Sequence, residues 1–197
     1  MSKVSGLRVA LVALGVLVGM QLTFPRTSAA QGLELGGGWA HATSNFGTDG
    51  FTINGAWFFT THIAAAAEYD TMWDTTDITG FAPAPTIDAK YHLQNFLIGP
   101  RYYFPLQQVT PRHSILPFAE FQIGGSHLHS RLEQGGFPDE INSDGGVSWL
   151  LGGGVDYPLS SAWSARGEIG LLRTHLNSSA QSRARIEIGL TYSFGER

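Results

Sequence analysis

The sequence predicts an all-β fold, an eight-stranded antiparallel up-and-down transmembrane β-barrel. Three observations carry this prediction. Stretches of about ten residues alternate between apolar and polar side chains, which is the period of a β-strand. Turn residues separate eight such stretches, an even number. The row opposite the apolar one holds small residues and a few charges of both signs, which suits the narrow interior of such a barrel.

The chain begins with a segment that is typical of export. Lys3 and Arg8 precede a continuous apolar run over residues 9–20, and small residues follow at 27–30. This run is too short for a spanning helix of roughly 20 residues, so it predicts a signal peptide over residues 1–30, cleaved after Ala30. The barrel domain then covers residues 31–197. An uncleaved anchor is the alternative.

Composition excludes some classes of function. After cleavage the chain keeps 9 basic and 16 acidic residues, a formal net charge of −7, and Lys90 is its one lysine. Nucleic acid is therefore excluded as a partner, because binding phosphates needs a basic surface. The chain has no cysteine, so an exported protein of this size needs another source of stability, and a closed, hydrogen-bonded barrel is one.

The alternating pattern defines each strand in turn. The first three stretches alternate regularly, and a tight turn at residues 60–61 joins the second to the third. The fourth is less regular, and its upstream part predicts a bulge or a change of phase near Asn95. The last four alternate again, and the eighth sets an apolar row from Ile186 to Phe194 against Glu187, Gly189 and their neighbours. The predicted strands cover residues 33–42, 51–59, 63–70, 89–104, 117–127, 147–157, 163–174 and 186–194.

The connectors alternate in character. Those after the second and sixth strands are tight, whereas those after the first, third, fifth and seventh are longer or more polar. This asymmetry is typical of outer-membrane barrels, which have short periplasmic turns and longer outer loops. We therefore expect four exposed loops on the outer side. Their acidic residues are expected to be solvated, or to bind divalent ions that bridge to lipid phosphates: Asp70, Asp74, Asp77, Asp88, Glu133, Asp139, Glu140 and Asp144.

The apolar rows are predicted to face lipid. If they faced a packed core, the opposite rows would face water and carry many lysines and glutamates. Instead, those rows hold glycine, alanine and serine with single charges, and a charge inside a narrow barrel needs a partner. The sequence therefore predicts an interior ion network of Glu34, Glu68, Arg101, Glu120, Asp156, Arg166, Glu168, Arg185 and Glu187. A soluble barrel with an apolar interior is the alternative.

Aromatic residues gather towards the two ends of the predicted strands. Amphipathic rings favour the membrane interface, so this placement predicts two girdles. The inner girdle would contain Trp57, Phe59, Tyr102, Phe104, Tyr157, Trp163, Tyr192 and Phe194. The outer girdle would contain Trp39, Phe51, Tyr69, Tyr91 and Trp149.

Four segments give the chain a resemblance to a known family: FLIGPRYYFP, PFAEFQIGG, LLGGGVDYPLS and RIEIGLTYSF. The chain resembles the small eight-stranded outer-membrane barrels related to the OmpA transmembrane domain and OmpX. The resemblance implies a bacterial outer-membrane location and the barrel-assembly machinery as a partner. Glu187, Gly189, Tyr192 and Phe194 match the assembly signal of that family. The chain departs from the family pattern in that Gly195, Glu196 and Arg197 follow the terminal aromatic.

Enzymatic motifs are mostly absent, and the sequence predicts neither a cofactor nor a metal. One polar stretch, with His127, His129 and Ser130 near Glu133, invites comparison with lipid A deacylases, whose serine needs a neighbouring base. Adjacent strand residues point to opposite faces, so His129 is poorly placed to serve Ser130. His127 and His129 share a face and could hold a metal with Glu133. The pattern favours polar residues where a strand leaves the membrane.

The predicted function is that of a non-enzymatic outer-membrane barrel with a plugged interior, which organises the envelope or contacts surfaces. Its expected partners are outer-membrane lipid, the barrel-assembly machinery and a possible surface ligand at the outer loops. The first alternative is a narrow channel or a carrier of small apolar molecules. The second is an outer-membrane lipid-modifying enzyme.

Overall fold

The computed structural model describes residues 32–43, 48–78, 87–105, 115–134, 137–176 and 179–194. The predicted signal peptide, residues 1–30, lies outside this part of the chain. Among the described residues, no helix has the length and apolar character needed to cross a bilayer. The strands are β1 (Leu33–Thr43), β2 (Thr48–Phe58), β3 (Ile63–Ile78), β4 (Ile87–Tyr103), β5 (Leu116–Gln134), β6 (Phe137–Pro158), β7 (Trp163–Leu176) and β8 (Ser179–Phe194).

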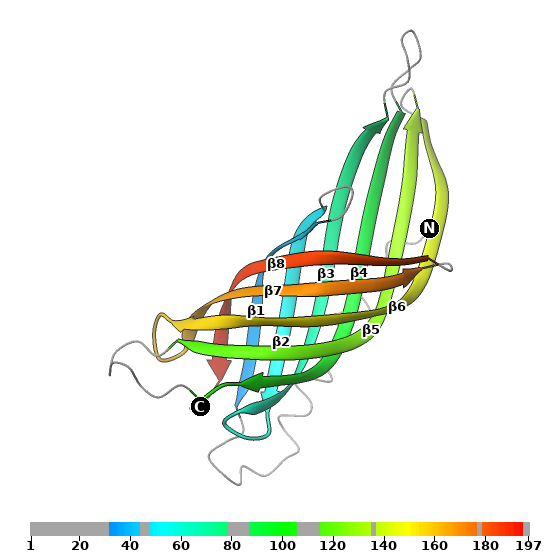
Figure 1. Ribbon diagram of the computed structural model, residues 1–197. Coiled ribbons are helices and arrows are strands. Elements are labelled where there is room, and N and C mark those ends of the chain that lie inside the picture. The colour runs from blue at the N-terminus through cyan, green and yellow to red at the C-terminus, as the bar shows by residue number, and fades with distance from the viewer. Residues whose placement is uncertain are drawn as a thin grey trace.

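The eight strands close into one antiparallel barrel (Figure 1). Each strand pairs with its neighbour in sequence, and β8 returns to pair with β1 from Leu33↔Phe194 to Thr43↔Ala184. Where β1 and β8 pair, closure leaves no unpaired strand edge. Strands in a bilayer require this, because lipid offers no hydrogen-bond partners. The predicted fold class is confirmed.

The apolar rows lie on the outside of the barrel. Ile53, Ile169 and Ile188 are each more than 60% exposed, whereas Arg101 is 0% exposed. An exterior of this kind is stable in lipid rather than in water. Two aromatic positions differ from the predicted girdles. Tyr91 lies on the inward row of β4, and Trp73 of β3 is the exposed aromatic at that level instead.

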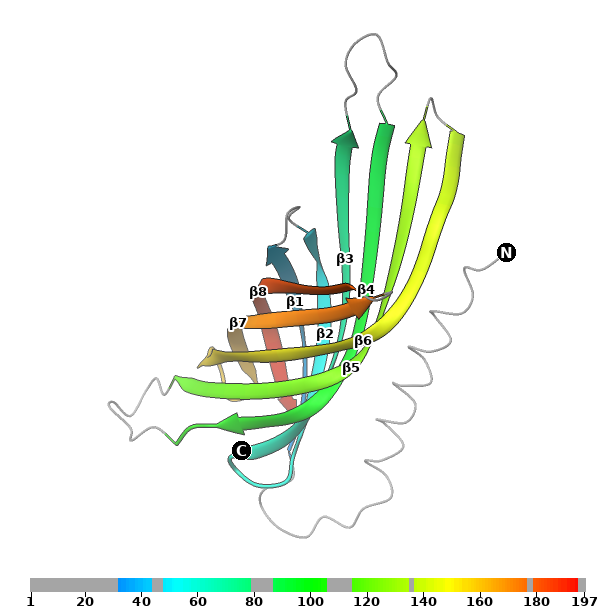
Figure 2. The same ribbon diagram turned by 45° about the vertical axis from the view of Figure 1, so that its right-hand side comes forward.

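Strands β3, β5 and β6 are much longer than the sequence predicted, whereas β4, with 17 residues, is close to its predicted length. β6 has 22 residues and β5 has 19, and they stay paired out to Gln134↔Phe137. Figure 2 shows these four strands projecting as a wall beyond the shorter ones. The prediction of long outer loops was therefore wrong for β5 and β6, because residues read as a loop continue the ladder. Outside a bilayer both faces meet water, so such a strand needs no apolar row.

The expected bulge near Asn95 is absent. β4 keeps one phase and one register with β5 from Ile87↔Gln134 to Tyr103↔Phe118, and Asn95 lies opposite Ser126. The irregular appearance of β4 has another cause: Leu93 and Leu97 fill the interior, while His92 and Gln94 on the outward row are polar. The register shift in this region occurs instead between β5 and β6, at Ser130/Arg131.

Candidate functional site

All nine charged residues assigned to the interior network point into the barrel and are buried. They come from strands far apart in the sequence, which the closed topology brings together. An interior carboxylate or guanidinium has little water around it, so the geometry of its partners decides whether it is stable there. The contacts fall into three groups, centred on Arg166, Arg101 and Arg185.

Arg166 of β7 is held mainly by Asp156 of β6, its direct cross-strand neighbour. Its Nε and Nη2 donate to the two carboxylate oxygens of Asp156, both at 2.8 Å, a bidentate arrangement. Nη2 also donates to the Tyr103 hydroxyl at 3.0 Å, and Glu34 lies at 3.4 Å. The ring of Phe118 packs against the guanidinium, 4.9 Å from its carbon.

Arg101 of β4 makes the neighbouring pair. Its Nε donates to Glu120 Oε2 of β5 at 2.7 Å, and both side chains have no solvent exposure. Its guanidinium carbon lies 4.7 Å from the centroid of the Phe118 ring, which it therefore shares with Arg166. One aromatic ring thus packs against two buried arginines.

Arg185 of β8 lies among four carboxylates. It contacts Glu187 at 2.7 Å, Glu68 at 2.8 Å, Asp70 at 3.0 Å and Glu168 at 3.1 Å. Asp70 is a correction to the sequence analysis, which placed it in a solvated outer loop. It is fully buried in the barrel. Its position two residues after Glu68, on the same strand face, was the signal for this role.

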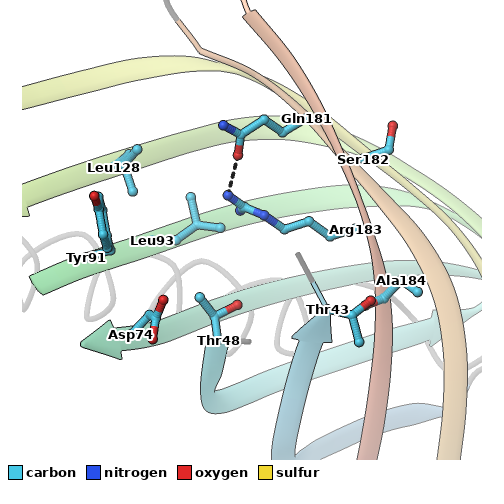
Figure 3. Close-up of a pocket in the computed structure, with 10 residues that line it drawn as sticks. All are labelled: Thr43, Thr48, Asp74, Tyr91, Leu93, Leu128, Gln181, Ser182, Arg183 and Ala184. Atoms are coloured by element: carbon cyan, nitrogen blue, oxygen red, sulfur yellow. Dashed lines mark hydrogen bonds between the residues drawn. The ribbon is translucent and has the colours of Figure 1, made fainter. Parts of the chain in front are cut away.

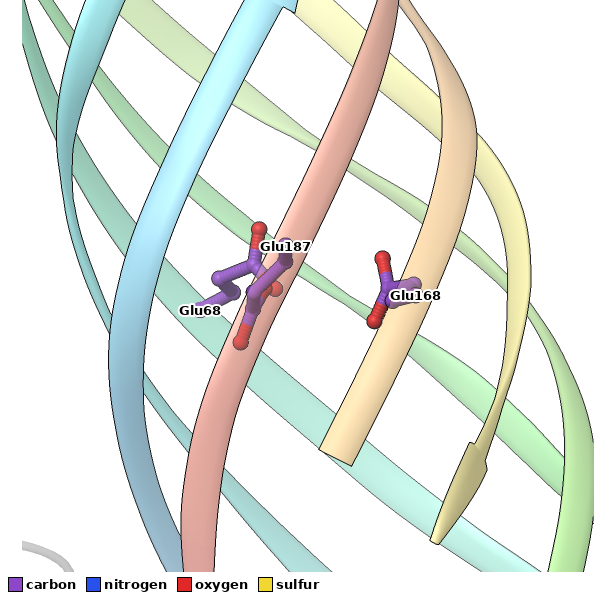
Figure 4. Close-up of side chains that lie close together, drawn as sticks. All are labelled: Glu68, Glu168 and Glu187. Carbon is purple, nitrogen blue, oxygen red and sulfur yellow. The ribbon is translucent and has the colours of Figure 1, made fainter. Parts of the chain in front are cut away.

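Three of these carboxyl groups lie close together (Figure 4). Oxygens of Glu68, Glu168 and Glu187 all fall within 4.8 Å of one another, the one such group of potential metal ligands among the described residues. Arg185 contacts all three, so its guanidinium brings one positive charge to the cluster. The arrangement is that of an ion-paired cluster in the barrel interior.

Apolar side chains fill the barrel on either side of the charged groups. Towards the end where β1 begins and β8 ends, the cluster consists of Ala56, Phe58, Ala64, Ala66, Tyr103 and Phe118. Towards the other end, two clusters contain Leu97, Leu150 and Leu172, and Ala40, Ala42 and Met72. Each leucine is completely buried. The interior is therefore layered, apolar then ionic then apolar.

A cavity of about 640 Å³ opens at the outer mouth of the barrel (Figure 3). It lies beyond the leucine layer. Leu93 of its wall stands four residues before Leu97 on the inward row of β4, and is therefore nearer the outer end of the barrel. Arg183 of β8 reaches into it and donates from Nη2 to Gln181 Oε1 at 2.6 Å. Sequence reasoning missed this site because the predicted eighth strand began only at residue 186. The lining residues are Thr43, Thr48, Asp74, Tyr91, Leu93, Leu128, Gln181, Ser182, Arg183 and Ala184.

The polar stretch on β5 is split by the strand. His127 and His129 lie on the outward row, with ring centroids 4.3 Å apart. His92 lies opposite His129, their rings 6.5 Å apart, which sequence reasoning could not find because the pairing is long-range. Ser130 lies opposite Tyr91 on the inward row. His129 and Ser130 therefore face opposite sides of the strand. The side chain of Glu133 lies outside the described part of the structure.

The barrel has counterparts among known proteins. Residues 9–194 match the family described as "Outer membrane protein beta-barrel domain". The chain belongs to this family. Membership in this family implies that the protein is located in the outer membrane. No curated protein sequence matches the chain significantly.

Solved structures of other outer-membrane barrels share the fold. Ail, the attachment invasion locus protein of Yersinia pestis, in complex with the heparin analogue sucrose octasulfate, gives a TM-score of 0.57 at 12% identity, over 84% of this chain and 99% of that one. OprG of Pseudomonas aeruginosa gives 0.52 at 12% identity, over 85% and 98%. At such identities the likeness shows the fold alone.

The residues of the predicted assembly signal lie on both faces of β8 in this outer-membrane barrel. Glu187 and Gly189 point inward, whereas Tyr192 and Phe194 point outward and their rings contact edge to face at 4.7 Å. Gly189 lies opposite Gly38 at the seam where β8 meets β1. A Cβ atom on Gly189 would lie 2.6 Å from the Gly37 carbonyl oxygen, so a side chain there requires the backbone of β1 to shift.

Proposed function

We propose that the protein is a non-enzymatic outer-membrane barrel with a plugged interior, which organises the envelope or contacts surfaces. The layered interior carries this proposal. A conducting path would have to pass the leucine layer, the ion pairs of Arg166 and Arg185, and the aromatic layer below them. Eight strands leave room for side chains but not for a water-filled pore beside them.

Conductance in planar bilayers tests the plug. The protein is first shown to be folded by a band that shifts on boiling, and is then added to a bilayer under voltage. We expect no steady open level at any voltage below membrane rupture. A reproducible open level in the folded protein would contradict the plug and favour the first alternative, a narrow channel.

The alternative of a carrier for small apolar molecules is tested separately. Vesicles with and without the barrel are loaded with a quencher, and uptake of a small apolar fluorophore is followed. Equal rates are expected, because the leucine layer closes the path from the outer mouth. Faster uptake with the barrel, abolished by boiling it beforehand, would favour the carrier.

The alternative of a lipid-modifying enzyme has weak support in the geometry. A serine nucleophile needs a base within hydrogen-bonding reach, and His129 and Ser130 lie on opposite strand faces. Substituting His127, His129 and Ser130 together by alanine should leave the lipid A profile of an expressing host unchanged. A change measured by mass spectrometry, relative to wild type at equal abundance, would overturn the non-enzymatic proposal.

Lipid, the assembly machinery and a surface ligand are the proposed partners. The apolar exterior supports lipid contact, and the β8 pattern supports recognition during assembly. The structural neighbour Ail was solved in complex with a heparin analogue, which supports testing this chain for a surface ligand. In the present chain, support for a ligand comes from the outer mouth itself.

A further inference from the structure

The outer mouth holds an arginine whose partners differ from those of every other interior arginine described. Arg183 and Arg185 lie on the same face of β8, two residues apart, yet Arg185 contacts four carboxylates. No carboxylate in the described part of the chain lies within 4.0 Å of the Arg183 guanidinium. Its one hydrogen bond goes to the neutral amide of Gln181.

Arg183 is nevertheless largely removed from bulk solvent. The residue is only 7% exposed, and its Nε and Nη1 have no hydrogen-bond partner. A buried guanidinium without an anion is costly, because its desolvation is not offset by an opposite charge. The side chain is therefore poised to bind an anion from the cavity that it lines (Figure 3).

The cavity suits a small organic ligand rather than a bare ion. Its volume of about 640 Å³ is in the ordinary range for small-molecule sites. Leu93 and Leu128 supply apolar contacts, and Tyr91 supplies a ring with a polar end. A ligand that fits would place an oxyanion at Arg183 and a compact apolar or ring body against these side chains.

The cavity also limits the charge of such a ligand. Asp74 of β3 contributes a carboxylate to the same lining, so a second negative charge on the ligand would meet repulsion. A ligand with a single carboxylate carries one negative charge at neutral pH, whereas a ligand with two carboxylates carries two. The chemistry thus favours a monocarboxylate.

We propose that the outer mouth of this barrel is a binding site for small organic monocarboxylates, with Arg183 as the anion-binding residue and Asp74 as the residue that selects against dianions. The site lies above the leucine layer. Binding at this site is therefore independent of whether the barrel below the site conducts or is plugged.

The test uses the full chain in lipid nanodiscs and follows backbone amide NMR shifts during titration with three probes. Benzoate has the proposed charge, benzamide is its neutral analogue, and phthalate has two carboxylates. We expect saturable shifts for residues that line the mouth with benzoate, and affinities lower by about tenfold or more for the other two. Equal affinity for benzoate and benzamide would overturn the proposal.

Two variants and one control identify the residues responsible. Arg183→Gln should weaken benzoate binding by about tenfold or more and leave benzamide unchanged. Arg173→Gln removes the same charge from the outward row of β7, next to Ser182 of β8, and should leave benzoate binding unchanged. Asp74→Asn should strengthen phthalate binding. Equal losses in the two arginine variants would show a nonspecific charge effect and overturn the site.

Discussion

Arg166 and Asp156 face each other across β7 and β6, and two hydrogen bonds of 2.8 Å join the guanidinium to both carboxylate oxygens. Neither side chain has any solvent exposure. A pair in this position gains little stability over an apolar pair of the same shape, but losing one partner leaves a buried charge unpaired. The interior is therefore predicted to be sensitive to single substitutions.

Asp156→Ala should lower the free energy of unfolding by about 3–5 kcal/mol, because Arg166 loses its bidentate partner. Urea unfolding in lipid vesicles measures this. The control is Asp49→Ala, which breaks the exposed contact between His41 and Asp49 at 2.9 Å and should cost less than about 1 kcal/mol. Equal costs for the two variants would contradict a buried network.

The closure seam makes a second prediction. Gly189→Ala places a Cβ atom 2.6 Å from the Gly37 carbonyl oxygen and 3.0 Å from Gly38 Cα, so β1 and β8 have to move apart. A cost of about 1–3 kcal/mol is expected, with less of the heat-modifiable band on a gel. Gly167→Ala is the matched control, because a Cβ there meets nothing within 4 Å. If both variants behaved alike, the seam would not be the cause.

The third prediction concerns the leucine layer of Leu97, Leu150 and Leu172. Leu150→Ala should destabilise the barrel by about 2–5 kcal/mol, since it leaves a cavity that the surrounding side chains fill only in part. Leu151→Ala removes the same atoms from the 55% exposed outer face of the same strand, where lipid can fill the space. Its cost should be clearly smaller in the same unfolding assay. The reverse order would mean that the two faces of β6 are exchanged.

The proposed assembly signal is tested in a cell. Phe194→Ala should lower the heat-modifiable fraction in the outer membrane, because it removes the terminal aromatic of β8. Phe104→Ala removes an exposed aromatic that follows β4, outside the signal, and should have a smaller effect. Equal loss in both variants would assign the effect to the aromatic girdle rather than to a signal.

The alternating rows predicted the fold because the bilayer separates lipid-facing from interior side chains residue by residue. Ile186 to Phe194 carry this signal clearly, and Glu187 and Arg185 on the opposite row are buried. The same logic extends to Asp70, which the sequence analysis assigned to a loop because it stands near the end of the predicted third strand. Where the bilayer ends was the missing information.

Beyond the bilayer the sequence carries less information. Residues 137–145 of β6 were read as a loop because their pattern has no apolar row, although they pair with β5. Arg183 was missed for the same reason, since it precedes the apolar row of β8. The neighbours of His92 and the lining of the outer mouth depend on register between strands, which no single strand pattern specifies.

The central claim is that the apolar row of β8 faces lipid, and the absence of cysteine makes it directly testable by spin labelling. Single variants Ile188→Cys, Leu190→Cys and Ser182→Cys carry the label on one outward row in lipid vesicles. We predict that labels at 188 and 190 collide often with oxygen and rarely with a water-soluble nickel complex, and that the label at 182 shows the opposite. Labels at 188 and 190 that are immobile and shielded from both reagents would mean that this row packs in a core, and would contradict the account.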